Sequence, residues 1–304
     1  MGTEKITETL EEPTSRLYGD APTTSLTVTV IGGSVDVVAT DDAGPATVDV
    51  HEISGPPLTV TWEAGALKVE QLKDSAGQMW GALGSLLSPA NSPGRPSVRL
   101  TVRVPDEAKV SVRSASADVL AGGSHGPVTI YTASGGVTLD HPTGSVDVTT
   151  ASGSVDCASP AGELTVKTAT GAITVQDAVL RTARVNTVSG ETVLDLRHGP
   201  SIVTANTVSG NVTVRVPQTT GYDVTAATVS GGVIVDGETV MDEGKRGGHR
   251  HTGDRSVAVK SRTVSGTLVL LRGGAAPGSA GPVIGEDLGD IQDDVPRREA
   301  GEGI

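Results

Sequence analysis

Apolar residues alternate with polar ones along most of the chain, in short runs separated by glycine, proline and aspartate. Alternation with a period of two is typical of β-strands with one buried face, and clusters of Gly, Pro and Asp favour turns. The runs begin at Leu26 and extend to Leu271. The pattern therefore predicts an all-β protein made of many short strands.

A four-residue signature recurs through these runs: Thr, then Ala or Val, then Ser or Thr, then Gly. Its copies begin at Thr132, Thr150, Thr168, Thr187, Thr207, Thr228 and Thr263, and a degenerate copy begins at Ser114. The successive steps are 18, 18, 18, 19, 20, 21 and 35 residues. A near-constant period of this length indicates a repeat architecture.

Each repeat contains two short strands, one before the signature and one after it, as in Val128/Ile130 and Val137/Leu139. Two strands and two corners per 18–21 residues predict one coil of a parallel β-solenoid, in which equivalent strands stack on one another. An antiparallel meander is the alternative, since short turns also connect hairpins. The solenoid is favoured because the two corners differ in chemistry while each type recurs at the full period.

The signature itself is predicted to form one of the two corners. Gly adopts the positive φ that a tight corner requires, and Ser or Thr hydroxyls bond neighbouring backbone groups. The Ala or Val before the Ser is expected to fill the inside of the bend. The leading Thr has the parity of the inward positions, so it either faces inward with its hydroxyl bonded to backbone or marks a break in the alternation.

Interruptions of the alternation divide the chain into four parts. Residues 1–23 are expected to be a flexible lead-in, and residues 24–113 carry N-terminal strands that are either early coils or a separate cap. Residues 110–271 form the predicted repeat array, with a loop insertion at 236–256. Residues 272–304 are Gly/Ala/Pro-rich and then acidic, which predicts a disordered tail.

Residues 73–96 interrupt the N-terminal strands with an apolar stripe at helical spacing, formed by Met79, Trp80, Leu83, Leu86 and Leu87. The stripe predicts a helical insert that packs on the body or covers an open end. A contact with a partner or a membrane interface is the alternative, although the Lys/Arg flank typical of such helices is missing.

Composition and charge narrow the class of protein. With 40 Gly, no Phe and 2% aromatic residues, the core must consist of Val, Leu, Ile and Ala, which suits stacked strands with a narrow interior. The net charge of −13 argues against nucleic-acid binding and against adsorption to anionic lipid. No apolar run approaches the ~18 residues of a membrane span. The N-terminus has no basic region followed by an apolar one, and Cys157 is the single cysteine, so a cytoplasmic location is expected.

The repeat units resemble a known family. Their form T-[A/V]-S-G-x-V-x-V, the V-x-V-P strand at 102–105 and the final unit R-T-V-S-G-T-L-V-L at 262–270 are similar to the DUF4097 family, a bacterial β-strand-repeat group also called "putative adhesins". The resemblance covers about Leu26 to Leu271. It implies a right-handed β-helix-like fold and no established catalytic activity.

Acidic residues recur near the second strand of several repeats and are the first candidates for catalysis. Asp140, Asp195 and Asp236 share one position after the signature, and Asp156 and Asp177 lie at nearby offsets. Glycoside hydrolysis needs two close carboxylates, whereas the three acids at the matching position lie in repeats that are not adjacent. We therefore expect turn residues that bond local backbone, and no catalytic residue.

Other candidate groups are also weak. His249 and His251, beside Asp242, Glu243 and Asp254, suggest a metal site, but their spacing matches no specific ligand pattern and a solvated loop is the simpler interpretation. Cys157 occupies an inward position and is expected to be a core residue, not a nucleophile. Gly32-Gly33 and Gly122-Gly123 open no helix, so no phosphate loop is predicted. The sequence predicts no cofactor and no metal.

The sequence thus predicts a non-enzymatic β-solenoid that acts as a scaffold or protein-interaction module, binding a protein partner or a second copy of itself. An adhesin-like protein that binds carbohydrate or a surface is the alternative. Sugar-binding sites usually present aromatic platforms, and Trp62, Trp80 and three Tyr are few.

Overall fold

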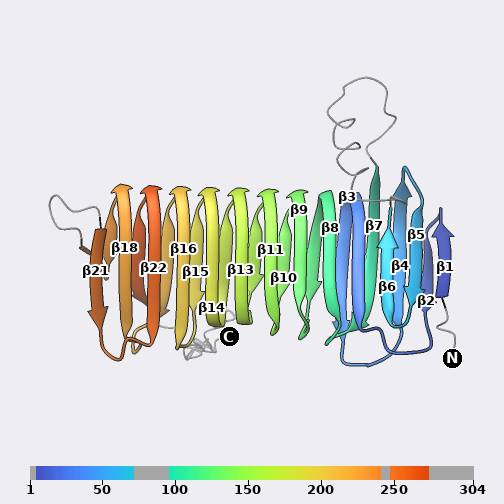
Figure 1. Ribbon diagram of the computed structural model, residues 1–304, viewed down its shortest axis with the longest axis horizontal. Coiled ribbons are helices and arrows are strands. Elements are labelled where there is room, and N and C mark those ends of the chain that lie inside the picture. Colours follow the sequence, from blue (N-terminus) through green and yellow to red (C-terminus); the bar gives the residue numbers. More distant parts are fainter. Residues whose placement is uncertain (1–4, 72–95, 241–246, 274–304) are drawn as a thin grey trace, which may run out of the picture. The chain divides into compact units, whose positions relative to one another are not determined.

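The computed structural model describes residues 5–71, 96–240 and 247–273, which form β-strands and turns without any helix (Figure 1). The all-β prediction is confirmed. The strands are β1 (Lys5–Leu10), β2 (Thr14–Tyr18), β3 (Ser25–Thr40), β4 (Ala46–Ser54), β5 (Leu58–Glu63), β6 (Ala66–Glu70), β7 (Ser97–Pro105), β8 (Lys109–Gly122), β9 (Val128–Ser134), β10 (Val137–Asp140), β11 (Ser145–Ser152) and β12 (Val155–Ala158). They continue as β13 (Ala161–Thr170), β14 (Ile173–Ser189), β15 (Thr192–Leu196), β16 (Ser201–Ser209), β17 (Val212–Pro217), β18 (Tyr222–Ser230), β19 (Val233–Val235), β20 (Glu238–Thr239), β21 (Gly247–Thr252), β22 (Val257–Ser265) and β23 (Leu268–Gly273).

Strands that end in the signature stack in parallel on one side of the protein, and we call them the signature layer. They are β9, β11, β13, the second half of β14, β16, β22 and β18. Within this layer, Thr132 pairs with Thr150 and Ser134 with Ser152, so the signatures lie side by side. The strands that follow each signature stack in parallel as the opposite layer, for example β10 on β12. The antiparallel alternative is therefore wrong for the array, which is β-solenoid-like.

The core lies between the two layers and is mainly aliphatic, as the composition predicts, with Tyr18, Trp62 and Tyr222 as its buried aromatic residues. Ile130 and Val148 of the signature layer and Leu139 and Val175 of the opposite layer are fully buried. Each such side chain stabilises the fold by about 1.5–3 kcal/mol relative to an exposed one.

The corner formed by the signature differs from expectation. The signature threonines face inward and are only 2–9% exposed, so the alternation is not broken at this position. The backbone bond expected for their hydroxyls is formed by Thr132, Thr168 and Thr187, whereas the other four hydroxyls have no partner among the described residues. Because strand residues alternate between faces, the Ala or Val that follows each Thr must point outward. The expectation that it fills the inside of the bend is wrong: Val188 is 52% and Val229 60% exposed.

The order of the repeats in space differs from their order in the chain. Thr263 of β22 pairs with Thr207 of β16 on one side and with Thr228 of β18 on the other. In the opposite layer β23 lies between β17 and β19 in the same way. The last unit of the chain, β22–β23, is therefore inserted between units β16–β17 and β18–β19 (Figure 1).

The segment between these units contains strands that the sequence did not predict. Residues 236–256 were expected to be a loop, but β20 pairs antiparallel with β19, and β21 pairs antiparallel with β18. The chain uses this segment to return to the space beside β16. The outward flank of β18 is thereby covered, because β21 supplies its backbone partners.

N-terminal strands continue the stack and then close it. Strand β3 pairs in parallel with β8 and with β6 and β7, whereas β1, β2, β4 and β5 pair antiparallel. The flexible lead-in predicted for residues 1–23 is wrong for β1 and β2, because Leu10 and Tyr18 are buried in the core. The predicted helical insert at 73–96 and the tail beyond Gly273 lie outside the described residues.

Each end of the core carries an ion pair on the core-facing side of its terminal strand, with side chains that are 37–67% exposed. At one end Glu8 lies opposite the buried Val60 and pairs with Arg16 at 3.3 Å. At the other end Arg250 lies opposite the buried Val224 and pairs with Glu238 at 2.9 Å. Inward charges at a sheet end discourage edge-to-edge association.

Candidate interaction surface

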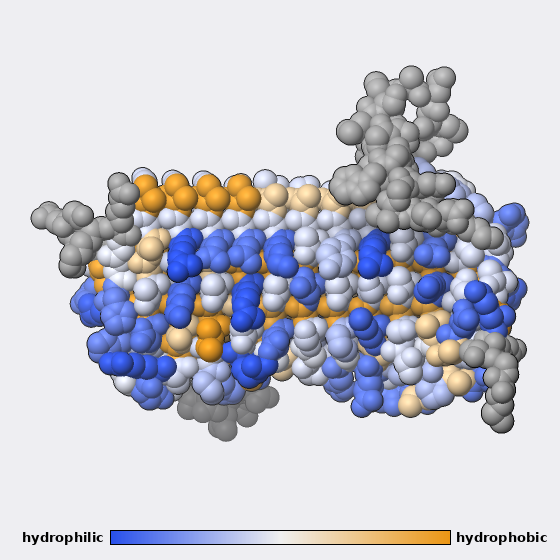
Figure 2. Space-filling model, in the orientation of Figure 1, coloured by the Kyte–Doolittle hydropathy of each residue, from blue (hydrophilic) through white to orange (hydrophobic). Residues whose placement is uncertain are grey.

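A row of exposed apolar side chains runs along the signature corner, and we call it the valine ridge. Its members come from four adjacent parallel strands, in the order β14, β16, β22 and β18: Val188 (52% exposed), Val208 (48%), Val264 (49%) and Val229 (60%). Neighbouring strands lie about 4.8 Å apart, so the side chains form a regular series. Figure 2 shows the row along the upper edge, continued by less hydrophobic residues.

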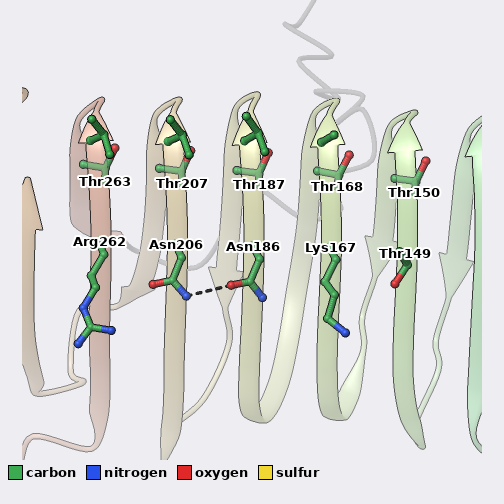
Figure 3. A pocket seen from close by; sticks show the side chains of 14 residues that line it. Thr149, Thr150, Lys167, Thr168, Asn186, Thr187, Asn206, Thr207, Arg262 and Thr263 are labelled. Atoms are coloured by element: carbon green, nitrogen blue, oxygen red, sulfur yellow. Dashed lines mark hydrogen bonds between the residues drawn. The ribbon is translucent and has the colours of Figure 1, made fainter.

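A ladder of longer polar side chains runs beside the ridge on the outer face of the signature layer. This polar ladder consists of Thr149, Lys167, Asn186, Asn206 and Arg262, each paired in register with the next. Asn206 Nδ2 donates a hydrogen bond to Asn186 Oδ1 at 2.9 Å (Figure 3). The amides thus support one another across the strands.

Three valines of the valine ridge and the polar ladder line one open depression of about 710 Å³ (Figure 3). Its apolar wall comes from Ala169, Val188, Val208 and Val264, and the polar ladder forms the other wall. An apolar row beside aligned amide and cationic groups is suited to binding.

The buried threonines beneath the ridge attach the corner to the strand ends. Thr132 Oγ1 donates to the Ser134 carbonyl at 2.6 Å and Thr168 Oγ1 to the Thr170 carbonyl at 3.1 Å. In other repeats the hydroxyl has no partner within the described part of the chain, as for Thr207 and Thr228. The corner backbone is also closely packed, since a Cβ on Gly171 would lie 2.1 Å from the Gly153 carbonyl oxygen.

The three acids that share one repeat position, Asp140, Asp195 and Asp236, lie in or directly after strands that are not neighbours. In the opposite layer, β12 and β14 separate the strand of Asp140 from that of Asp195, and β17 and β23 separate β15 from β19, which precedes Asp236. Three of the recurring acids have local partners: Asp140 with His141 at 2.6 Å, Asp195 with Arg215 at 3.3 Å and Asp177 with Arg197. Asp156 lies in β12 between Thr138 and Thr174 of its neighbours.

Asp236 is the most constrained of these carboxylates. Its Oδ2 accepts hydrogen bonds from the Tyr222 hydroxyl at 2.7 Å and from Arg272 Nε at 2.8 Å. Burial alone would raise the pKa of Asp236, but the bonds from Arg272 and Tyr222 hold it below its usual value. Burial and the same carboxylate raise the pKa of Tyr222. The group links two repeat units and is structural.

The histidine cluster gives no metal site in the part of the chain that is described. His249 Nε2 lies 2.9 Å from Asp223 Oδ1, and the rings of His249 and His251 are 5.5 Å apart. Asp254 is committed to a turn, where hydrogen bonds from Ser256 lower its pKa. No three His, Cys, Asp or Glu side chains among the described residues converge as metal ligands, and Asp242 and Glu243 lie outside them.

Cys157 lies between Leu139 and Val175 in the stacked core and is 2% exposed. Burial, assisted by Asp140, raises the pKa of its thiol to about 12, so the thiolate needed for nucleophilic chemistry is scarce at neutral pH. Gly32 and Gly33 lie within β3 and form no phosphate loop.

Sequence reasoning missed the valine ridge. The available signal was the change from Ala to Val at the second signature position, which begins at Val188 and persists through Val208, Val229 and Val264. Combined with the inward parity of Thr, the alternation of a strand would have placed these valines outside.

A β-solenoid-like repeat array with an exposed corner surface defines the general class of protein. The chain belongs to the Toastrack DUF4097 family, whose profile matches residues 58–269. The family resemblance seen in the repeat units is thereby confirmed. No curated protein matches the chain.

The chain is similar to two solved structures. One is described as a "putative cell adhesion protein" from Clostridium sporogenes, with 11% identity, a TM-score of 0.28, and coverage of 86% of this chain and 100% of that one. The other is a "putative lipid binding protein" from Parabacteroides distasonis, with 15% identity, a TM-score of 0.39, and coverage of 86% and 97%. At these TM-scores neither likeness supports a conclusion about ligand or partner. No helix in the described residues has the length and apolar character that crossing a membrane requires.

Proposed function

We propose that this protein is a non-enzymatic interaction module: a β-solenoid with two strands per 18–21-residue coil that presents a rigid side surface to a protein partner or to a second copy. The valine ridge carries the proposal. Four β-branched apolar side chains in an unbroken row are 48–60% exposed, and contact of this apolar surface with water is unfavourable. Covering them with another protein surface would remove that cost.

The chemistry of the polar groups supports a binding role over catalysis. Asp140, Asp195 and Asp236 are held by local partners, and the thiol of Cys157 is buried. Catalytic carboxylates and nucleophiles must instead reach a substrate within hydrogen-bond distance.

Protein is favoured over carbohydrate as the partner class. Of the aromatic residues that the structure describes, Tyr131 is exposed, whereas Tyr18, Trp62 and Tyr222 are at most 4% exposed. A single exposed ring is a poor platform for a sugar chain. The cytoplasmic location expected from the sequence stays a prediction.

Site-specific photo-crosslinking in the cells that naturally make this protein tests this function. A photoreactive residue at Val208 is expected to give a defined protein adduct or a crosslinked dimer, whereas the same residue at Val179, an exposed valine away from the ridge (42%), gives none. The adduct should disappear when Val188, Val264 and Val229 are replaced by Ser. Size-exclusion chromatography with light scattering separates self-association from a foreign partner. Equal labelling at both positions, or none, would overturn the proposal.

A further inference from the structure

Four cations gather on the outer face of the signature layer, directly beside the valine ridge. Lys167 and Arg262 belong to the polar ladder, with Asn186 and Asn206 between them in register. Arg184 and Lys260 lie on the same outer face in the neighbouring row, two residues farther from the corner along their strands, with Thr204 between them. Strand spacing of about 4.8 Å places all four within about 15 Å.

These cations lack the ion pairs that most other cations among the described residues have. Among the described residues, Arg184, Lys260 and Arg262 form no ion pair, and Lys167 has only a marginal contact with Asp147 at 4.0 Å. Nearby carboxylates are otherwise engaged: Glu163 by Arg181 and Asp223 by His249. A locally cationic face is unusual in a chain of net charge −13.

The four cations and the valine ridge together indicate which chemical groups a ligand of this surface must carry. Arg and Lys side chains bind carboxylates, Arg in a two-pronged geometry, and the Asn186–Asn206 pair offers further amide donors and acceptors. The valine ridge, at the other wall of the same depression, needs apolar side chains. A protein segment supplies both kinds of group, whereas a polyanionic glycan or a nucleic acid supplies only the charge.

Long-range electrostatics do not prevent such an encounter. The net charge of −13 repels an acidic partner at a distance, but charges separated by more than about 8 Å are screened at physiological ionic strength. At contact the attraction of the four cations exceeds the screened repulsion from the rest of the protein. An acidic partner is therefore attracted to this face and repelled by the other, acidic surfaces.

We infer that the cations Lys167, Arg184, Lys260 and Arg262, with the valine ridge, bind an extended protein segment that carries both carboxylate and aliphatic side chains. The segment lies along the depression, across β13, β14, β16 and β22, with its aliphatic side chains on the valines. This inference rests on the proposed function and names the partner class of the same surface.

Fluorescence anisotropy with a short labelled peptide of alternating Glu and Val tests the inference on the full chain. Relative to the wild type, K260E/R262E and V208S/V264S should each bind the peptide at least about tenfold more weakly. The first variant removes cationic side chains of the site and the second removes apolar ones. The matched control K68E/K109E makes the same change in net charge at exposed lysines of β6 and β8 and should alter binding by less than about twofold. All substituted residues are exposed, and thermal unfolding verifies that each variant folds.

Further measurements distinguish the proposed peptide ligand from other ligands. Peptides with Gln for Glu or Ser for Val should bind at least about tenfold more weakly. Heparin or phosphatidylserine vesicles that bind while the Glu-Val peptide does not would overturn the inference in favour of a general polyanion site. Absence of peptide binding together with a Val208-specific protein crosslink would overturn the inference alone and leave the proposed function standing. Unchanged peptide binding in K260E/R262E would also overturn it.

Discussion

Arg272, in the last repeat unit of the chain, forms an ion pair with Asp236 of the preceding unit. That preceding unit lies beyond the last one in the stack. The guanidinium reaches Asp236 Oδ2 through Nε at 2.8 Å and Nη2 at 2.7 Å, and the Arg272 backbone N–H donates to Oδ1 at 3.2 Å. The guanidinium carbon also lies 5.6 Å from the centre of the Tyr222 ring. This contact holds unit β22–β23 against unit β18–β19.

Removing this carboxylate should loosen the terminal units. D236N is expected to lower the free energy of unfolding by about 1–3 kcal/mol near pH 7, because the hydrogen bonds from Arg272 and Tyr222 lose their charged acceptor. The pKa of Asp236 is lowered in the folded state, so its contribution is present above the unfolded pKa of about 3.9 and is lost as pH falls through the folded pKa. Urea denaturation of both proteins should therefore converge at low pH. As a control, D140N changes the corresponding exposed residue of another repeat, and a loss as large as that of D236N would contradict this account.

Corner glycines should differ sharply in their tolerance of a side chain. Gly171 has φ +142° and a Cβ there would lie 2.1 Å from the Gly153 carbonyl oxygen, so G171A is expected to cost at least about 1–3 kcal/mol. Gly136 is the matched control, since its Cβ would meet only side-chain atoms at 3.6 Å and 3.7 Å. Thermal unfolding checks both variants. Equal midpoints would show that the corners are not tightly stacked.

The signature threonines should respond in opposite directions to the same substitution. Thr228 is 2% exposed and its hydroxyl has no partner in the described residues, so the isosteric T228V is expected to stabilise by up to about 1 kcal/mol. T168V removes the hydrogen bond to the Thr170 carbonyl and should cost about 1 kcal/mol. Urea midpoints of the two variants test the contrast, and shifts of the same sign would refute it.

Inward ion pairs at the two ends should keep copies from stacking end to end. Replacing Arg250 and Glu238 together with Val exposes an apolar end, and concentration-dependent oligomers are expected in light scattering. The control R99V/E52V removes an exposed ion pair on β7 and β4 and should remain at the size of the wild type. Oligomers in the control, or none in the end variant, would show that the charges do not protect the end.

Much of the repeat array was predictable from local pattern. Alternation assigns each residue of a strand to one face, so the pattern alone places Val128, Ile130 and Val137 in the core, where all three are buried. The recurring signature also predicted that Thr132 would align with Thr150. The same local logic failed for the lead-in, because β1 and β2 are too polar to resemble strands until β5 and β4 pair with them.

The candidate surface was harder to predict, because it joins residues that are distant in sequence. Lys167, Arg184, Lys260 and Arg262 become neighbours only when β22 takes its place beside β16. If β18 stood there instead, Ala227 and Thr225 would occupy the positions of Arg262 and Lys260. The charge of this face is therefore a property of the stacking order.

By itself, the sequence determined the strands, the inward and outward faces and the in-register parallel stacking, because these follow from a period of two and from a signature that matches only itself. The tertiary structure alone decided which unit lies next to which. Since the signatures at Thr207, Thr228 and Thr263 are equivalent, β16 could pair with β18 or β22 equally well by pattern. The antiparallel return through β20 and β21 and the Arg272–Asp236 contact selected the inserted order.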